Sequence, residues 1–74
     1  MDKGNASAFN SLGIKYCYGT ESLPQDYQQM KKLFLKAGEL GDADGYTNLG
    51  NAYREGWGVE VDLKKAKYFM NLQP

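Results

Sequence analysis

Residues 4–19 read GNASAFNSLGIKYCYG, and residues 41–56 read GDADGYTNLGNAYREG. The second stretch repeats the first after 37 residues, and six of the sixteen positions are identical. The identical pairs are Gly4/Gly41, Ala6/Ala43, Leu12/Leu49, Gly13/Gly50, Tyr16/Tyr53 and Gly19/Gly56. A period of this length is typical of stacked repeat proteins, in which each unit buries its apolar face against its neighbour.

Composition argues against several classes of function. The chain has 74 residues with nine basic and nine acidic side chains, so it carries no net charge that would attract nucleic acid or an acidic membrane surface. It contains no histidine and a single cysteine, Cys17. The usual protease dyads, an internal disulfide and a cysteine–histidine zinc set are therefore ruled out. We predict no catalytic residues, no cofactor and no metal site.

Targeting signals are likewise not evident in the sequence. No apolar run is as long as a membrane span, and the first residues do not begin a signal peptide. We therefore expect no membrane partner and a cytoplasmic location.

Apolar spacing and capping residues predict a helix pair in the first repeat. Asn5 is placed to cap a helix that Gly19 ends. Asp26 is placed to cap the next helix, with Gln29 completing a capping box, and Gly41 stops it. The predicted apolar positions are Ala8, Phe9, Leu12 and Tyr16 in the first helix, and Met30, Leu33, Phe34 and Ala37 in the second.

The same pattern predicts a second helix pair. Either Asp42 or Asp44 caps a third helix that Gly56 stops, and Asp62 caps a fourth. The predicted apolar positions are Tyr46, Leu49 and Tyr53, then Ala66, Phe69 and Met70. The expected fold is all-α, an alpha-alpha superhelix or short α-solenoid made of two antiparallel helix hairpins. Residues 1–74 form one repeat domain, with repeat one at about 4–40 and an incomplete repeat two at about 41–74.

Glycine occurs twice at the same place inside the predicted first helix of each pair. Gly13 and Gly50 each lie between a leucine and a tyrosine of the apolar stripe. An interior glycine costs about 1 kcal/mol relative to alanine. We therefore expect close approach of a neighbouring helix backbone at both positions, and a similar role for Gly38.

These features together resemble the Sel-one-like repeat family (SLR), helical-hairpin relatives of the tetratricopeptide repeat. The second unit carries the resemblance most fully, through Leu49-Gly50, Tyr53, Gly56, Gly58-Val59, Asp62 and Lys65-Ala66. The first unit shares Ala6, Ala8, Leu12-Gly13, Tyr16, Gly19, Asp26, Ala37 and Gly41. The resemblance implies an adaptor or scaffold that assembles protein complexes.

Departures from the family pattern indicate part of a longer array. The last unit stops before the small-residue pair and glycine that usually finish such a repeat, and the first begins as if it followed another helix. Because solenoids generally need about three or more repeats, we expect a longer protein, marginal stability or self-association through uncapped repeat ends. A remnant fragment without an independent role is a further alternative.

The predicted function is a non-catalytic protein-protein interaction module that holds a protein or peptide partner on its concave face. First helices usually line that face in helical-hairpin solenoids. The candidate partner-binding residues are Asn10, Ile14, Tyr18, Thr47, Asn51 and Glu55 on the first helices, and Trp57 in a loop where packing is favoured over binding.

Two further readings accompany this prediction. An SLR-type β-lactam-binding or hydrolysing enzyme is the alternative class, but the resemblance implies a cysteine pair in each repeat of such proteins, which Cys17 alone cannot provide. Two lysine clusters favour a solvated face over an anion site. They comprise Lys31, Lys32 and Lys36, and Lys64, Lys65 and Lys67.

Overall fold

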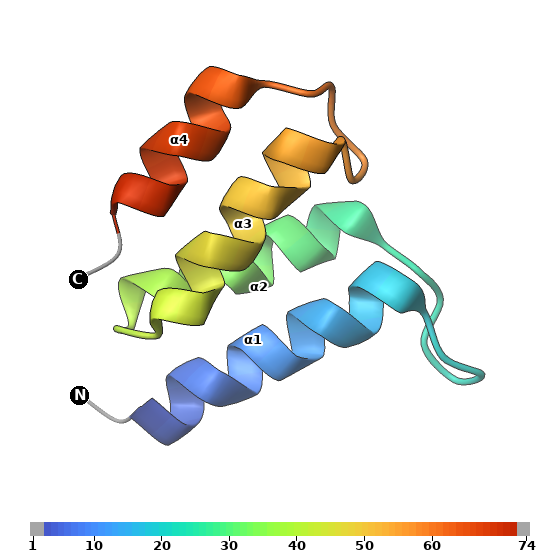
Figure 1. Ribbon diagram of the computed structural model, residues 1–74. Helices are drawn as coiled ribbons and strands as arrows, with labels where there is room; N and C mark the ends of the chain where they lie inside the picture. The colour runs from blue at the N-terminus through green and yellow to red at the C-terminus, as the bar shows by residue number, and fades with distance from the viewer. Residues whose placement is uncertain (1–2, 73–74) are drawn as a thin grey trace.

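The computed structural model describes residues 3–72, so the predicted repeat end at Pro74 lies outside the described residues. These residues form four helices in two antiparallel hairpins, with no strand among them (Figure 1). Helices α1 and α2 span Lys3–Tyr18 and Tyr27–Glu39, and helices α3 and α4 span Ala43–Glu55 and Leu63–Asn71. The predicted all-α superhelical repeat fold is confirmed.

The start of each second helix is tied to the end of the first helix in the same hairpin. The Asp26 side chain accepts two backbone N–H bonds of the first turn of α2, at 3.0 and 3.2 Å. The backbone N–H of Asp26 donates to the carbonyl of Tyr16 at 2.9 Å. Asp62 repeats both features, with two bonds of 3.1 Å to the first turn of α4 and one of 2.9 Å to the carbonyl of Tyr53. Both predicted caps are confirmed, and each also closes its hairpin.

The predicted capping box at Asp26 is only half formed. In such a box the Gln29 side chain would accept the backbone N–H of Asp26. That N–H instead donates to the carbonyl of Tyr16. The prediction is wrong for Gln29 because the tertiary contact between α1 and α2 already uses this donor.

The turn between the hairpins is built around a left-handed glycine. Gly41 has φ +104°, and its N–H donates to the carbonyl of Gly38 at 3.1 Å. The N–H of Asp42 donates to the carbonyl of Ala37 at 3.0 Å, which completes the pair of bonds of a Schellman motif. Asp42 then caps α3 by accepting the N–H of Asp44 at 2.9 Å. The open choice between Asp42 and Asp44 is thus resolved in favour of Asp42.

The predicted cap at Asn5 is wrong. Helix α1 begins at Lys3, and Asn5 lies inside it with an exposed side chain. The corresponding aspartate, Asp42, is kept out of α3 because the turn at Gly41 brings the chain round from α2. Gly4, which aligns with Gly41, is helical, so the backbone never makes that turn before α1.

The core lies where α2 and α3 face their neighbours. Its buried members are Cys17, Met30, Phe34, Leu49 and Ala52. Tyr16, Tyr53 and Phe69 are half-buried and pack against this cluster. Within the predicted apolar stripe of α2, Met30, Phe34 and Ala37 are confirmed as buried, whereas Leu33 is half-buried.

Leu12 and Ala8 do not belong to this core. The Leu12 side chain is 38% exposed, whereas its repeat equivalent Leu49 is 2% exposed. Leu49 is buried because α3 packs against both α2 and α4. No helix within residues 3–72 covers the matching face of α1, so the prediction that Leu12 is buried is wrong.

Glycines set the distances between the helices. A Cβ atom on Gly45 would lie 2.5 Å from the backbone nitrogen of Gly38 and 2.6 Å from the carbonyl oxygen of Phe34. A Cβ on Gly50 would lie 3.0 Å from the carbonyl oxygen of Ala66, so the predicted backbone approach is confirmed there. Among these glycines, the closest approach to backbone atoms is therefore at Gly45, which the repeat pattern did not single out.

At Gly13 and Gly38, the nearest neighbours of an added Cβ atom would be aromatic side chains. A Cβ on Gly13 would lie 2.7 Å from the ring of Phe34, and one on Gly38 would lie 2.7 Å from the ring of Tyr46. Neither position has room for a side chain, but the predicted approach of a neighbouring backbone is wrong at Gly13, because the Phe34 side chain fills that space. The neighbour that fills the space is an aromatic ring of an adjacent helix.

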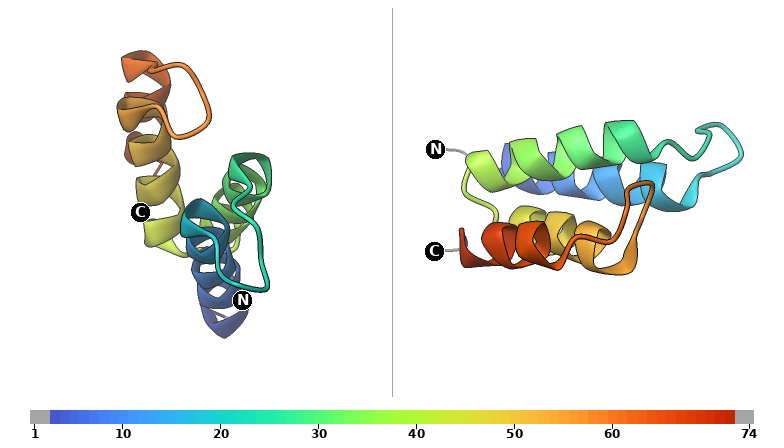
Figure 2. Two further views of the ribbon diagram at one scale, coloured as in Figure 1. Left: turned by 90° about the vertical axis from the view of Figure 1, so that its right-hand side faces the viewer. Right: turned by 90° about the horizontal axis from the view of Figure 1, so that it is seen from above.

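The helices do not form a closed bundle. Helices α1 and α2, α2 and α3, and α3 and α4 pack as successive pairs, whereas α1 and α3 touch at only a few points. In the described part of the chain, the backbones of α2 and α4 make no contact. Figure 2 shows the two hairpins set at an angle, with α3 next to α2 and α4 away from it. Within the same residues, no helix combines the length and apolar character needed to cross a bilayer.

Replacing Gly45 with alanine tests the contact between α2 and α3. We expect Gly45→Ala to lower the free energy of unfolding by about 1–3 kcal/mol, because the new methyl group meets backbone atoms that cannot turn away. Gly50→Ala should cost less, since the flexible Met70 side chain can yield. Urea denaturation followed by circular dichroism measures both, with the exposed-site variant Ser7→Ala as control. A rise in stability of Gly45→Ala, as helix propensity alone would give, would contradict the contact.

Candidate functional site

The predicted partner-binding residues of α1 differ in accessibility. Tyr18 is 78% exposed and Ile14 is 40% exposed. Their four-residue spacing places them on one face of the helix. Asn10 lies one turn earlier and is half-buried. The accessible part of this row is therefore its end nearest the loop to α2.

Two of the three predicted partner-binding residues of α3 are less accessible than Tyr18 and Ile14. Thr47 and Asn51 are half-buried, and the Thr47 hydroxyl donates to the carbonyl of Ala43 at 3.1 Å. Glu55 is exposed and forms an ion pair of 3.4 Å with its chain neighbour Arg54. This face of α3 therefore offers the amide of Asn51 and the carboxylate of Glu55.

An amide pair joins the two hairpins. The Nδ2 of Asn48 donates to the Oδ1 of Asn10 at 2.8 Å, and the bond is partly buried. It links α1 and α3, which otherwise touch little. Asn10 thus has a structural partner within the chain. Asn48 was not predicted because its repeat equivalent is Ser11, and nothing in the spacing pairs positions 10 and 48.

Trp57 packs onto the core, as the sequence favoured. Its side chain is half-buried against the buried cluster, and its backbone N–H donates to the carbonyl of Ala52 at 2.8 Å. The next residue, Gly58, has φ +71° and lies directly against Tyr27 at the start of α2. The loop between α3 and α4 therefore rests on the first hairpin.

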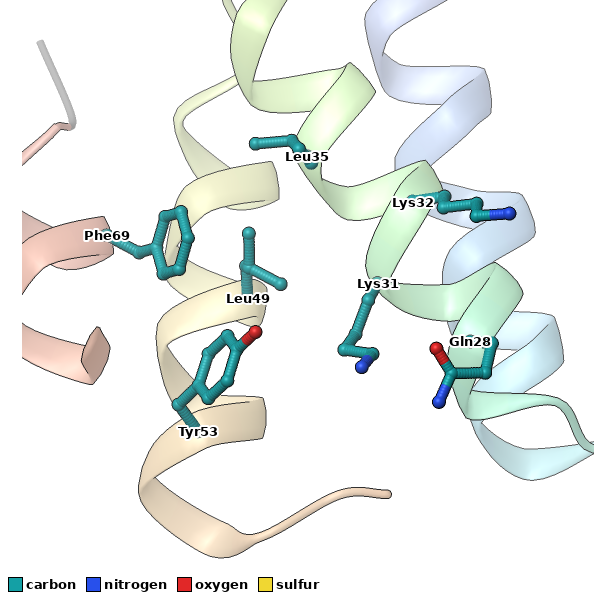
Figure 3. Close-up of a pocket in the computed structure, with 7 residues that line it drawn as sticks. All are labelled: Gln28, Lys31, Lys32, Leu35, Leu49, Tyr53 and Phe69. Atoms are coloured by element: carbon teal, nitrogen blue, oxygen red, sulfur yellow. The ribbon is translucent and has the colours of Figure 1, made fainter. Parts of the chain in front are cut away.

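A groove between α2 and α4 was not predicted from the sequence. Figure 3 shows Lys31 and Leu35 of α2 on the side of Tyr53 and Phe69, whereas the Lys32 side chain extends away from these rings. The groove holds a pocket of about 230 Å³ lined by Gln28, Lys31, Lys32, Leu35, Leu49, Tyr53 and Phe69. The only sequence signal was the lysine cluster, which was assigned to a solvated face. The aromatic side of the groove was assigned to the core.

A second depression lies on α1. It has a volume of about 400 Å³ and is lined by Asn5, Ala8, Phe9 and Leu12. Its lining is mainly apolar, in keeping with the exposure of Leu12.

The described residues show neither an activated cysteine nor a cluster of metal ligands. Burial raises the pKa of the Cys17 thiol, which opposes formation of a reactive thiolate. Between residues 3 and 72 no group of three or more metal-ligating side chains comes together. Over the same span, no buried side-chain nitrogen or oxygen atom is without a hydrogen-bond partner. The accessible features are surfaces and grooves suited to binding.

Comparison with known sequences identifies relatives over nearly the whole chain. The family described as "Sel1 repeat" matches residues 6–42 and 43–72. "Beta-lactamase HcpA" of Helicobacter pylori is 50% identical over 70 residues, which cover 93% of this chain and 26% of that protein. "Putative beta-lactamase HcpC" of the same organism is 51% identical over 41 residues, which cover 55% of this chain and 14% of that protein.

A plant relative shares the pattern. "ERAD-associated E3 ubiquitin-protein ligase component HRD3A" of Arabidopsis thaliana is 36% identical over 56 residues, which cover 76% of this chain and 8% of that protein. The chain thus spans between 8% and 26% of the length of these relatives.

A double-mutant cycle tests the amide pair between α1 and α3. We expect Asn10→Ala and Asn48→Ala each to lower the free energy of unfolding, with a coupling energy of about 0.5–1.5 kcal/mol, because each change leaves the other amide without its partner. Urea denaturation of both single variants and the double variant gives this value. A control cycle that pairs Ser11→Ala with Asn48→Ala should give none. Strictly additive effects for Asn10 and Asn48 would show that the bond does not stabilise the fold.

Proposed function

Because this chain belongs to the Sel1 repeat family, we propose that it is a non-catalytic protein-protein interaction module of the adaptor or scaffold kind. The resemblance drawn from the sequence is thereby confirmed, and Sel1 repeats generally mediate protein-protein interaction. HRD3A is itself named as a component of a ligase, which supports a role within an assembly.

The exposed row on α1 is the observation that carries this proposal. Tyr18 and Ile14 are large apolar side chains that project into solvent without a covering helix. Aromatic side chains of this kind supply much of the binding energy at protein interfaces. Asn51 and Glu55 on α3 add polar groups that can hydrogen-bond a partner backbone. We place the partner on this face, which we expect to be concave.

We also propose that another repeat stacks on the apolar depression of α1. After the shift of 37 residues, Ala8 and Phe9 correspond to Gly45 and Tyr46, and Leu12 corresponds to Leu49. Those three residues of α3 lie against α2 or in the core. The second helix of a preceding repeat would cover α1 in the same manner, with repeat boundaries near 4–40 and 41–74 as proposed. In the isolated chain the same face would drive self-association.

An enzymatic role is the second candidate because two relatives are named as β-lactamases. The chain covers at most 26% of the length of either protein. Among residues 3–72, the burial of Cys17 and the lack of a metal-ligating cluster give no support to a reactive centre. We therefore favour binding over hydrolysis, and a remnant fragment without a function of its own remains the third alternative.

A peptide selection tests the partner-binding face. We expect peptides selected on the immobilised chain from a displayed random library to shift the NMR signals of Ile14 and Tyr18. The double variant Ile14→Glu with Tyr18→Ala should weaken binding about tenfold or more, because it removes the exposed apolar anchors. The exposed-site variant Lys67→Glu is the control.

Two results would contradict the proposal. One is selected peptides that bind the double variant as tightly as the parent chain. The other is hydrolysis of the β-lactam nitrocefin by the purified chain at a rate that is above that of a heat-denatured sample.

Sedimentation tests the stacking face on α1. We expect the chain to associate as its concentration rises, and Leu12→Glu to shift it toward monomer by placing a charge in the apolar depression. Ile14→Glu is the matched control, because Ile14 is 40% exposed and Leu12 is 38% exposed on the same helix. Equal association of both variants would show that this depression is not the contact.

A further inference from the structure

We propose that the groove between α2 and α4 is a second docking surface, which takes a partner segment carrying one large apolar side chain flanked by carboxylates. The proposal rests on the general role of the chain as an interaction module. It uses different residues from the exposed row on α1, so the two surfaces can be tested separately.

The fold itself holds the groove open. Helix α3 packs against both α2 and α4, whereas α2 and α4 make no backbone contact in the described part of the chain. Close approach at Gly45 fixes α3 against α2, and close approach at Gly50 fixes α3 against α4. The groove therefore has α3 as its floor, and neither wall can close over it without breaking one of these contacts.

The size of the pocket suits one side chain. Its volume of about 230 Å³ lies below the range of roughly 300–1,000 Å³ that is usual for small-molecule sites. It reaches down to Leu49, which is only 2% exposed. A single buried anchor of a partner segment is a common source of binding energy at interfaces. A phenylalanine or leucine is the matching occupant.

Aromatic rings form the wall on the side of α3 and α4. The rings of Tyr53 and Phe69 stack with centroids 5.6 Å apart and an angle of 15° between their planes. Tyr68 packs edge-on against Phe69 at 5.3 Å, and the ammonium of Lys65 lies 5.3 Å from the Tyr53 centroid. These contacts hold the wall in place before a partner arrives, which lowers the ordering cost of binding.

The wall formed by α2 is basic. Lys31 and Lys32 line the pocket, and no carboxylate does. The ion pair between Arg54 and Glu55 is the only one among residues 3–72, so neither lysine is neutralised by an acidic neighbour. The charge of Lys31 lies on the side of the aromatic wall, and that of Lys32 lies on the outer edge of α2 (Figure 3). Carboxylates flanking the apolar anchor would complement both charges.

Acidic residues near the groove indicate where the carboxylates of the partner would lie. A polar extension continues from Lys31 and Tyr53 to the loop before α4, where it is lined by Glu60 and Asp62. Asp62 is engaged as the cap of α4, and Glu60 is exposed. A carboxylate placed there would be repelled, so we place those of the partner along α2.

A titration with a designed peptide tests the proposal. The probe is a short acetylated and amidated peptide with a central phenylalanine between pairs of glutamates, followed by NMR on the labelled chain. We expect the signals of Leu35, Leu49 and Phe69 to shift and binding to weaken with salt. The double variant Lys31→Glu with Lys32→Glu should weaken binding about tenfold. Lys36→Glu with Lys67→Glu is the matched control, because both lysines are exposed on α2 and α4 and neither lines the pocket.

Several outcomes would overturn the proposal. They are no shift at the groove, equal binding of a peptide with alanine at its centre or lysines around it, or equal weakening by the control variant. Circular dichroism of both lysine variants checks that the helices are retained. The variant Ile14→Glu with Tyr18→Ala should bind this probe as the parent does. Loss of binding there but not at the lysines would support the α1 face and refute the groove.

Discussion

The fold depends on the contact between α2 and α3 at Gly45. The backbone of α2 lies where a side chain at this position would be, so the two helices pack at a distance that no other residue permits. The left-handed turn at Gly41 and the cap at Asp42 position the start of α3 for this contact. Because one helix from each hairpin takes part, the contact sets the angle between the hairpins.

Within each hairpin a polar contact has the corresponding role. The backbone of Asp26 donates to the carbonyl of Tyr16, and the backbone of Asp62 donates to the carbonyl of Tyr53. Each aspartate thereby satisfies the start of one helix and the end of another. The loops before these caps differ in length by one residue, yet the contact is kept, which shows that it defines the hairpin more strictly than the loop does.

Because of these contacts, the two sides of the molecule differ. On one, α1 and α3 are joined by the amide pair of Asn10 and Asn48, and the proposed binding row lies beside it. On the other, α2 and α4 stay apart and leave a groove with an aromatic wall and a basic wall. Both surfaces exist because successive helices pack in pairs instead of closing into a bundle, as is usual for solenoids.

The sequence alone determined the four helices, three of the four predicted starts and the helix-ending glycines, because caps, apolar spacing and left-handed glycines act within a few residues. It also indicated the family. It did not determine which equivalent residues are buried: Leu49 is covered by neighbouring helices, whereas Leu12 is exposed. The amide pair and the groove between α2 and α4 were likewise decided only by tertiary structure, since they join residues far apart in the chain whose meeting depends on how the helices pack.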